Sequence, residues 1–137
     1  MKICKNIVLS IVSILIGTYI YIFYRQDIVF KTYFNLDNIY NYQDCSNNFI
    51  KYYLIYCLPD ALWYFALLII QIELLTKIFF SQLLFLVSIA LPFICEILQL
   101  FNKIKGTFDI RDVCIYLITL LIVLWKERKK LFLLYFN

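Results

Sequence analysis

The chain has 137 residues, of which 64% are apolar and 16% charged, with 13 basic and 9 acidic side chains. A globule of this size has too little interior to hide so much apolar surface, which excludes an ordinary soluble domain and favours lipid as the surrounding solvent. Histidine, the commonest general base and metal ligand, is absent, and so apolar a chain carries no nucleic-acid-binding signal.

The first apolar run covers residues 7–24, close to the ~20 residues that a helix needs to cross a bilayer. Lys2 and Lys5 precede it, as in a signal peptide. The run ends in the aromatic segment Tyr19–Tyr24 and not in a small-residue cleavage site, so we expect an uncleaved helix. The polar stretch that follows, residues 25–51, predicts an extramembrane loop lying on the lipid headgroups.

Pro59 and Asp60 interrupt the second apolar run, and a helix is predicted over residues 58–73. Proline is favoured in the first turn of a helix, and a negative charge there complements the helix dipole. We therefore expect the membrane helix to begin at Leu58, with residues 52–57 as an interfacial lead-in. The alternative is one kinked helix that carries Asp60 at depth, where an unpaired carboxylate is costly.

A third helix is predicted over residues 78–101, with a kink at Pro92, and a fourth over residues 110–125. A turn that contains Lys103 and Lys105 joins them. The sequence thus predicts an all-α fold, a membrane-embedded bundle of four transmembrane helices in a single domain. One long loop connects the first two helices.

An even number of crossings places both termini on one side of the membrane. A basic cluster follows the fourth helix, namely Lys126, Arg128, Lys129 and Lys130. Together with Lys2 and Lys5 it indicates that this side is cytoplasmic, since cytoplasmic loops carry the excess of lysine and arginine. The first loop, the start of the second helix and the turn over residues 103–112 then share the outer face.

Two pairs of polar residues stand out at helix ends. Glu96 and Gln99 are three residues apart, hence on one helix face, near the end of an otherwise apolar segment. Ionisable groups in such segments usually face the bundle interior or a wet cavity. Asp109 and Asp112 form a second pair at the start of the fourth helix, where one is expected to be the N-cap and the other is left for a different role.

We expect these side chains to converge in one shallow cavity at the outer face. The candidate site comprises Asp60, Glu96, Gln99, Asp109 and Asp112, with Lys103, Lys105 and Arg111 as basic partners. Clustered carboxylates bind cations, relay protons or act in acid–base catalysis. The structural alternative is that Glu96 stays protonated or pairs with a basic residue and only ties helices together.

Neither a metal site nor a cofactor site is predicted. The five cysteines form no CxxC pair, and no nucleophile motif or phosphate-cradling loop is present. Whether the chain is an enzyme is left open by these residues.

The stretch Cys95–Ile122, CEILQLFNKIKGTFDIRDVCIYLITLLI, resembles the VanZ-like family of small bacterial membrane proteins. The shared pattern is Glu-x-x-Gln at a helix end, a short basic turn with glycine, and Asp-x-x-Asp opening the last helix. The segment Leu58–Leu68, LPDALWYFALL, is similar to an earlier helix of the family. The chain departs from the pattern where lysines replace the arginine of the turn, where Tyr116 replaces an asparagine, and where Trp63 stands near the place of a histidine.

The resemblance implies a bacterial inner-membrane protein of four or five helices that acts at the cell envelope. Its partners would be the lipid bilayer and a lipid-linked envelope substrate or other membrane proteins. The namesake of the family is associated with low-level teicoplanin resistance, a property not transferred to this chain. Two alternatives stay open: a small transporter or channel subunit whose carboxylates bind ions, and a structural accessory subunit whose polar residues lock helices together.

Overall fold

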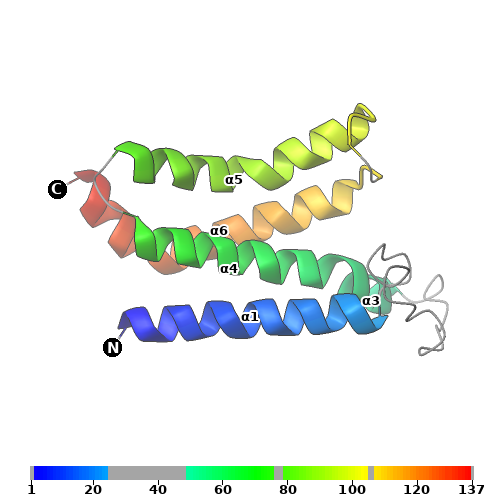
Figure 1. Cartoon of the computed structure of the whole chain (residues 1–137), viewed down its shortest axis with the longest axis horizontal. Helices are drawn as coiled ribbons and strands as arrows, with labels where there is room; N and C mark the ends of the chain where they lie inside the picture. Colours follow the sequence, from blue (N-terminus) through cyan, green and yellow to red (C-terminus); the bar gives the residue numbers. More distant parts are fainter. Residues whose placement is uncertain (1, 25–48, 76–78, 105–106, 137) are drawn as a thin grey trace.

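The computed structural model describes residues 2–24, 49–75, 79–104 and 107–136, and this part of the chain confirms the predicted all-α fold. Its four long helices lie side by side in a bundle: α1 (Lys2–Tyr24), α4 (Leu58–Leu74), α5 (Phe79–Leu100) and α6 (Ile110–Phe136) (Figure 1). Two short segments, α3 (Phe49–Tyr52) and the π-helix η1 (Tyr53–Cys57), lead directly into α4. Helix α4 is central, because it contacts α1, α5 and α6.

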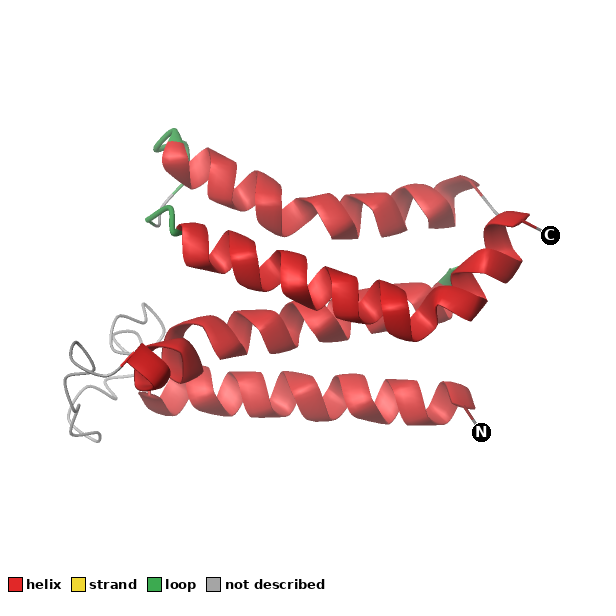
Figure 2. Cartoon of the chain, turned by 180° about the vertical axis from the view of Figure 1, so that it is seen from behind, coloured by secondary structure: helices red, strands yellow, loops and turns green. Residues whose placement is uncertain are grey.

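The two ends of the bundle differ in what they contain. The described chain starts and finishes at one end, which we call the terminal end (Figure 1, Figure 2). Segment α3 and the turn between α5 and α6 lie at the opposite end, which we call the turn end. An even number of long helices produces this arrangement.

Within the described residues, three segments are long and apolar enough to cross a membrane: Lys5–Tyr24, Ile50–Leu74 and Phe80–Leu100. Their outward side chains are large and apolar, as at Leu15, which is 63% exposed. Contiguous apolar surface of this kind is a liability in water, so the structure agrees with a multi-pass membrane protein. Helix α6 is not among the three, because its largely apolar part, Val113–Trp125, is shorter than the ~20 residues a crossing needs. A fourth crossing stays a prediction.

Three predicted boundaries differ from the structure by more than one residue. The first helix, predicted from residue 7, begins at Lys2. The predicted end of the fourth helix at Trp125 is wrong, because α6 continues through the basic cluster to Phe136. The segment after Trp125 is rich in lysine, glutamate, arginine and leucine, which are all good helix formers. The fall in hydropathy at Lys126 therefore does not end the helix. Most of the predicted loop, residues 25–48, lies outside the described residues, and its last residues, Phe49–Lys51, are helical.

Pro59 explains the π-helical turn that precedes α4. Proline has no backbone N–H, so the carbonyl of Ile55 loses the donor that a regular helix would supply. The backbone N–H of Leu58 instead donates to the carbonyl of Tyr53, five residues earlier. The α-helical segment begins at Leu58 and carries Asp60 in its first turn, while the lead-in is itself helical.

A stripe of small residues lets α1 approach α4 closely. Ser10, Ser13 and Gly17 are buried on one face of α1, a pattern frequent where membrane helices pack together. A Cβ atom at Gly17 would lie 2.9 Å from Nε1 of Trp63, so the approach requires glycine. The same Nε1 donates a hydrogen bond to Oγ1 of Thr18 at 3.3 Å, which fixes the indole against α1.

An apolar core fills the middle of the bundle. Its side chains come from α4, α5 and α6 and include Leu68, Ile69, Ile72 and Val123, which have no exposed surface. These residues lie along α4 and α6 between the polar groups of the two ends. The turn end and the terminal end are therefore separated by a dry layer.

Candidate functional site

A cavity of about 600 Å³ lies at the turn end, and all five residues of the predicted site line it. Four of its lining side chains are carboxylic acids and five are aromatic, with Gln99 and Thr107 completing the wall. The acids are Asp60, Glu96, Asp109 and Asp112, and the aromatic residues are Tyr21, Tyr52, Tyr56, Trp63 and Tyr116. No lysine or arginine of the described segments belongs to the lining.

Three helices and one turn bring the acidic side chains together. Asp60 lies in the first turn of α4, Glu96 near the end of α5, and Asp112 in the first turn of α6. Glu96 is only 5% exposed, although it is an acid on a helix whose outward face is apolar. Burial of an acid among apolar groups is costly. At the cavity wall, Glu96 has polar neighbours that the lipid-facing side of α5 does not offer.

The turn between α5 and α6 is held against Glu96. Two residues after the end of α5, Asn102 adopts the left-handed conformation (φ 54°). The backbone N–H of Lys103 donates to the carbonyl of Leu98 at 2.8 Å, which is a common way for a helix to end. Beyond this turn the backbone N–H of Asp109 donates to Oε2 of Glu96 at 3.3 Å. Glu96 thus accepts a hydrogen bond from a backbone amide across the turn.

Asp109 is the N-cap of α6. Its Oδ1 accepts a hydrogen bond from the backbone N–H of Arg111 at 2.9 Å, as capping residues do. Its Oδ2 accepts a hydrogen bond from the hydroxyl of Tyr52 at 3.1 Å, which links α6 to α3. Asp112 is therefore the aspartate whose side chain is not needed as a cap, and it lines the cavity.

The predicted basic partners lie outside the lining. The guanidinium carbon of Arg111 is 4.9 Å from the centre of the Tyr52 ring, so Arg111 covers this tyrosine at the rim. Lys103 is exposed, and Lys105 lies outside the described residues.

Sequence reasoning missed the aromatic half of the cavity. Tyr52 and Tyr56 stack with ring centres 4.9 Å apart. The ring centres of Tyr21 and Trp63 are 5.0 Å apart. The spacing of Tyr52 and Tyr56, four residues apart, was the available signal, because such residues share a helix face. Nothing local in the sequence assigns Tyr21, on α1, to the same cavity.

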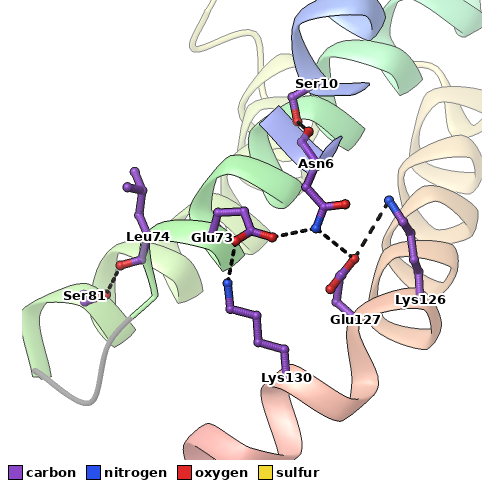
Figure 3. A network of polar contacts seen from close by, with 8 residues as sticks. All are labelled: Asn6, Ser10, Glu73, Leu74, Ser81, Lys126, Glu127 and Lys130. Atoms are coloured by element: carbon purple, nitrogen blue, oxygen red, sulfur yellow. Dashed lines mark hydrogen bonds and ion pairs between the residues drawn. The ribbon is translucent and has the colours of Figure 1, made fainter. Parts of the chain in front are cut away.

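A second group of polar side chains, the terminal cluster, was also missed (Figure 3). It consists of Asn6, Glu73, Lys126, Glu127 and Lys130. The amide nitrogen of Asn6 donates to Oε1 of Glu73 at 2.5 Å and to Oε1 of Glu127 at 3.3 Å. One amide thus joins α1, α4 and α6 at the terminal end.

Charges in the terminal cluster are closely paired. Nζ of Lys130 lies 2.8 Å from Oε2 of Glu73, and Nζ of Lys126 lies 3.9 Å from Oε1 of Glu127. Glu127 is 2% exposed, and its Oε2 has no hydrogen-bond partner among the described residues. The cluster locks three helices together, and a buried acid makes that lock sensitive to substitution.

The cavity wall combines carboxyl groups with aromatic rings. In the described segments, no three cysteine, aspartate or glutamate side chains are arranged to hold a metal. Aromatic faces and separated carboxylates are instead the groups that recognise ammonium ions. The chain matches no protein-family model, no curated protein and no solved structure, so its function is inferred from the cavity itself.

Proposed function

We propose that this protein is a VanZ-like, multi-pass membrane protein of the bacterial cell envelope whose cavity binds the ammonium group of an envelope molecule. The observation that carries the proposal is the cavity lining, which combines four carboxyl groups and five aromatic rings with no basic side chain among the described residues. A volume of about 600 Å³ suits a small molecule or a headgroup.

An ammonium ion complements this lining in two ways. Aromatic faces attract a cation through the ring quadrupole, and the attraction is worth up to ~2 kcal/mol when water is excluded. Carboxylates that share a cavity repel one another when ionised, so a bound cation relieves that repulsion. A neutral or anionic ligand would gain neither effect.

The basic cluster in the last part of α6 supports an outward-facing cavity. Lys5 lies near the start of α1, and the basic cluster, Lys126, Arg128, Lys129 and Lys130, lies in the C-terminal part of α6. The start of α1 and the end of α6 are at the terminal end of the bundle (Figure 1). The positive-inside rule then favours cytoplasmic termini and an outer location for the turn end. The ligand would reach the cavity from the outer leaflet, which suits a lipid-linked envelope substrate.

The dry core favours binding over conduction through the bundle. Leu68, Ile69, Ile72 and Val123 are fully buried between the two polar ends, so an ion would have to cross apolar side chains. A transporter or channel would therefore need a path between several copies of the chain. An accessory role is favoured by the terminal cluster, whose contacts have the character of a helix lock.

A tryptophan in the cavity wall provides a direct test. The chain has two tryptophans, so a Trp125→Phe variant retains only Trp63, which lines the cavity. We expect choline chloride to change the Trp63 emission of this purified variant in a saturable manner, and sodium chloride at equal ionic strength to leave it unchanged. An identical response to both salts would contradict an ammonium site.

Charge-neutral variants separate a binding role from a structural one. Glu96→Gln and Asp112→Asn are each expected to weaken choline binding about tenfold, or about 1.4 kcal/mol. The control Lys103→Gln changes the charge at the same end of the bundle outside the cavity, and it should bind as the parent does. Normal folded yield with weakened binding supports a site, whereas lost yield in both acid variants supports the structural alternative.

A further inference from the structure

An apolar groove lies beside the cavity. The end of α1 and the segment that leads into α4 contribute side chains to both. It has a volume of about 290 Å³ and lies between the end of α1 and the lead-in to α4. Its lining residues are Ile20, Tyr24, Lys51, Leu54, Ile55 and Leu58. Among the described residues that line the groove, Lys51 alone is charged.

Helical spacing explains how two elements serve two different sites. In the lead-in, Tyr52 and Tyr56 line the cavity, whereas the neighbouring face carries Leu54 and Leu58 in the groove. In α1, Tyr21 lines the cavity, while Ile20 and Tyr24 line the groove. Residues adjacent in sequence therefore face the cavity and the groove, which places the two sites next to each other.

Location and charge identify what fills the groove. Its residues lie at the ends of two candidate membrane spans, Lys5–Tyr24 and Ile50–Leu74. The end of a helix that crosses a bilayer lies where the hydrocarbon meets the headgroup layer. An apolar groove on such a surface is filled by an acyl chain. Lysine at this level attracts lipid phosphate, and the neighbouring cavity carries the opposite charge.

We infer that the ligand is a phospholipid with an ammonium headgroup, whose acyl chain occupies the groove, whose phosphate lies beside Lys51 and whose ammonium group enters the cavity. Lys51 lines the groove and the next residue, Tyr52, lines the cavity, so a phosphate at Lys51 would lie where the two sites adjoin. This inference rests on the proposed ammonium site and adds the class of molecule that carries the ammonium group. A free organic cation has no use for the groove, and an anionic lipid has no group for the cavity.

Three soluble probes test the inference in the full-length Trp125→Phe protein in a non-ionic detergent. These are dihexanoyl phosphatidylethanolamine, its chain-free headgroup glycerophosphoethanolamine, and dihexanoyl phosphatidylglycerol, which has the chains without the ammonium group. We expect phosphatidylethanolamine to bind at least about tenfold more tightly than glycerophosphoethanolamine, because its chain buries apolar surface in the groove. Phosphatidylglycerol should leave the Trp63 emission unchanged.

Groove variants should remove the gain that the acyl chains provide. Leu54 is 51% exposed, so Leu54→Gln is expected to fold and to bind phosphatidylethanolamine no more tightly than glycerophosphoethanolamine. Lys51→Gln should weaken phosphatidylethanolamine severalfold. The matched control Leu86→Gln, at a 58% exposed position of α5 away from the groove, should retain the full gain.

The outcomes distinguish this inference from the proposed function. If glycerophosphoethanolamine binds and the acyl chains add nothing, or if Leu54→Gln keeps the gain, the lipid is excluded while the ammonium site stands. If phosphatidylglycerol changes the emission as strongly as phosphatidylethanolamine, headgroup selection is excluded. If no ammonium-bearing probe binds, the proposed function fails and the inference fails with it.

Discussion

Gly17→Val is expected to lower the free energy of unfolding by about 3 kcal/mol, because overpacking a tight helix contact is strongly destabilising. Even the first added carbon would lie 2.9 Å from Nε1 of Trp63 and 3.2 Å from the carbonyl oxygen of Pro59. Helix α1 would have to move away from α4, which would also break the hydrogen bond from Trp63 to Thr18. Reversible unfolding in mixed micelles measures the change.

A matched control uses valine at the neighbouring position. Ile16 is 47% exposed on the outward face of α1, so Ile16→Val should change the free energy of unfolding by less than about 0.5 kcal/mol. Gly17→Ala should fall between the two variants, since it adds one carbon. If Gly17→Val were as stable as Ile16→Val, α1 and α4 would not approach as closely as described.

Asn6→Leu should destabilise the bundle by a similar amount, about 3 kcal/mol, through the terminal cluster. The substitution removes the one amide that donates to both Glu73 and Glu127. In the variant, Glu73 would keep the ammonium group of Lys130 at 2.8 Å. Among the described residues, Glu127 would keep only the ammonium group of Lys126 at 3.9 Å. A carboxyl group that is 2% exposed would then lack a hydrogen-bond donor on both oxygens.

A double-variant cycle tests this explanation. Removing both partners of a buried polar contact is far less costly than removing one, so Asn6→Leu combined with Glu127→Leu should recover most of the stability lost in Asn6→Leu. Chemical or thermal unfolding of the four proteins gives the coupling energy. Additive losses in the double variant would show that Asn6 and Glu127 do not depend on each other.

Local patterns were sufficient to predict the helices and much of the cavity. Long apolar runs gave the all-α fold, since few other structures satisfy the backbone of such segments in lipid. The three-residue spacings of Glu96 with Gln99 and of Asp109 with Asp112 placed each pair on one helix face. Because both pairs flank the same short turn, their convergence could be predicted from the connectivity of the chain. Asp60 was added to them because four consecutive crossings place the start of the second helix on the same side of the membrane as that turn.

Features that depend on helix register could not be predicted. Asn6, Glu73 and Glu127 meet only because α1, α4 and α6 pack with one particular offset, and in the sequence each resembles an ordinary polar residue at a segment end. The aromatic wall has the same origin, since Tyr21 reaches the cavity from α1. The length of α6 was underestimated because hydropathy falls at Lys126 whereas helix propensity does not.

The reactivity of a cysteine at position 107 tests the central claim, a water-filled, cation-attracting cavity on the outer face. Thr107 lines the cavity without carrying charge, so Thr107→Cys in a chain whose five native cysteines are replaced by serine leaves all four acids in place. In intact cells, a membrane-impermeant trimethylammonium methanethiosulfonate should modify it faster than the sulfonate analogue, and choline should slow the reaction. Arg128→Cys, at the terminal end, should react only in opened membranes. Modification of Thr107→Cys only in opened membranes, or at equal rates with both reagents, would contradict the claim.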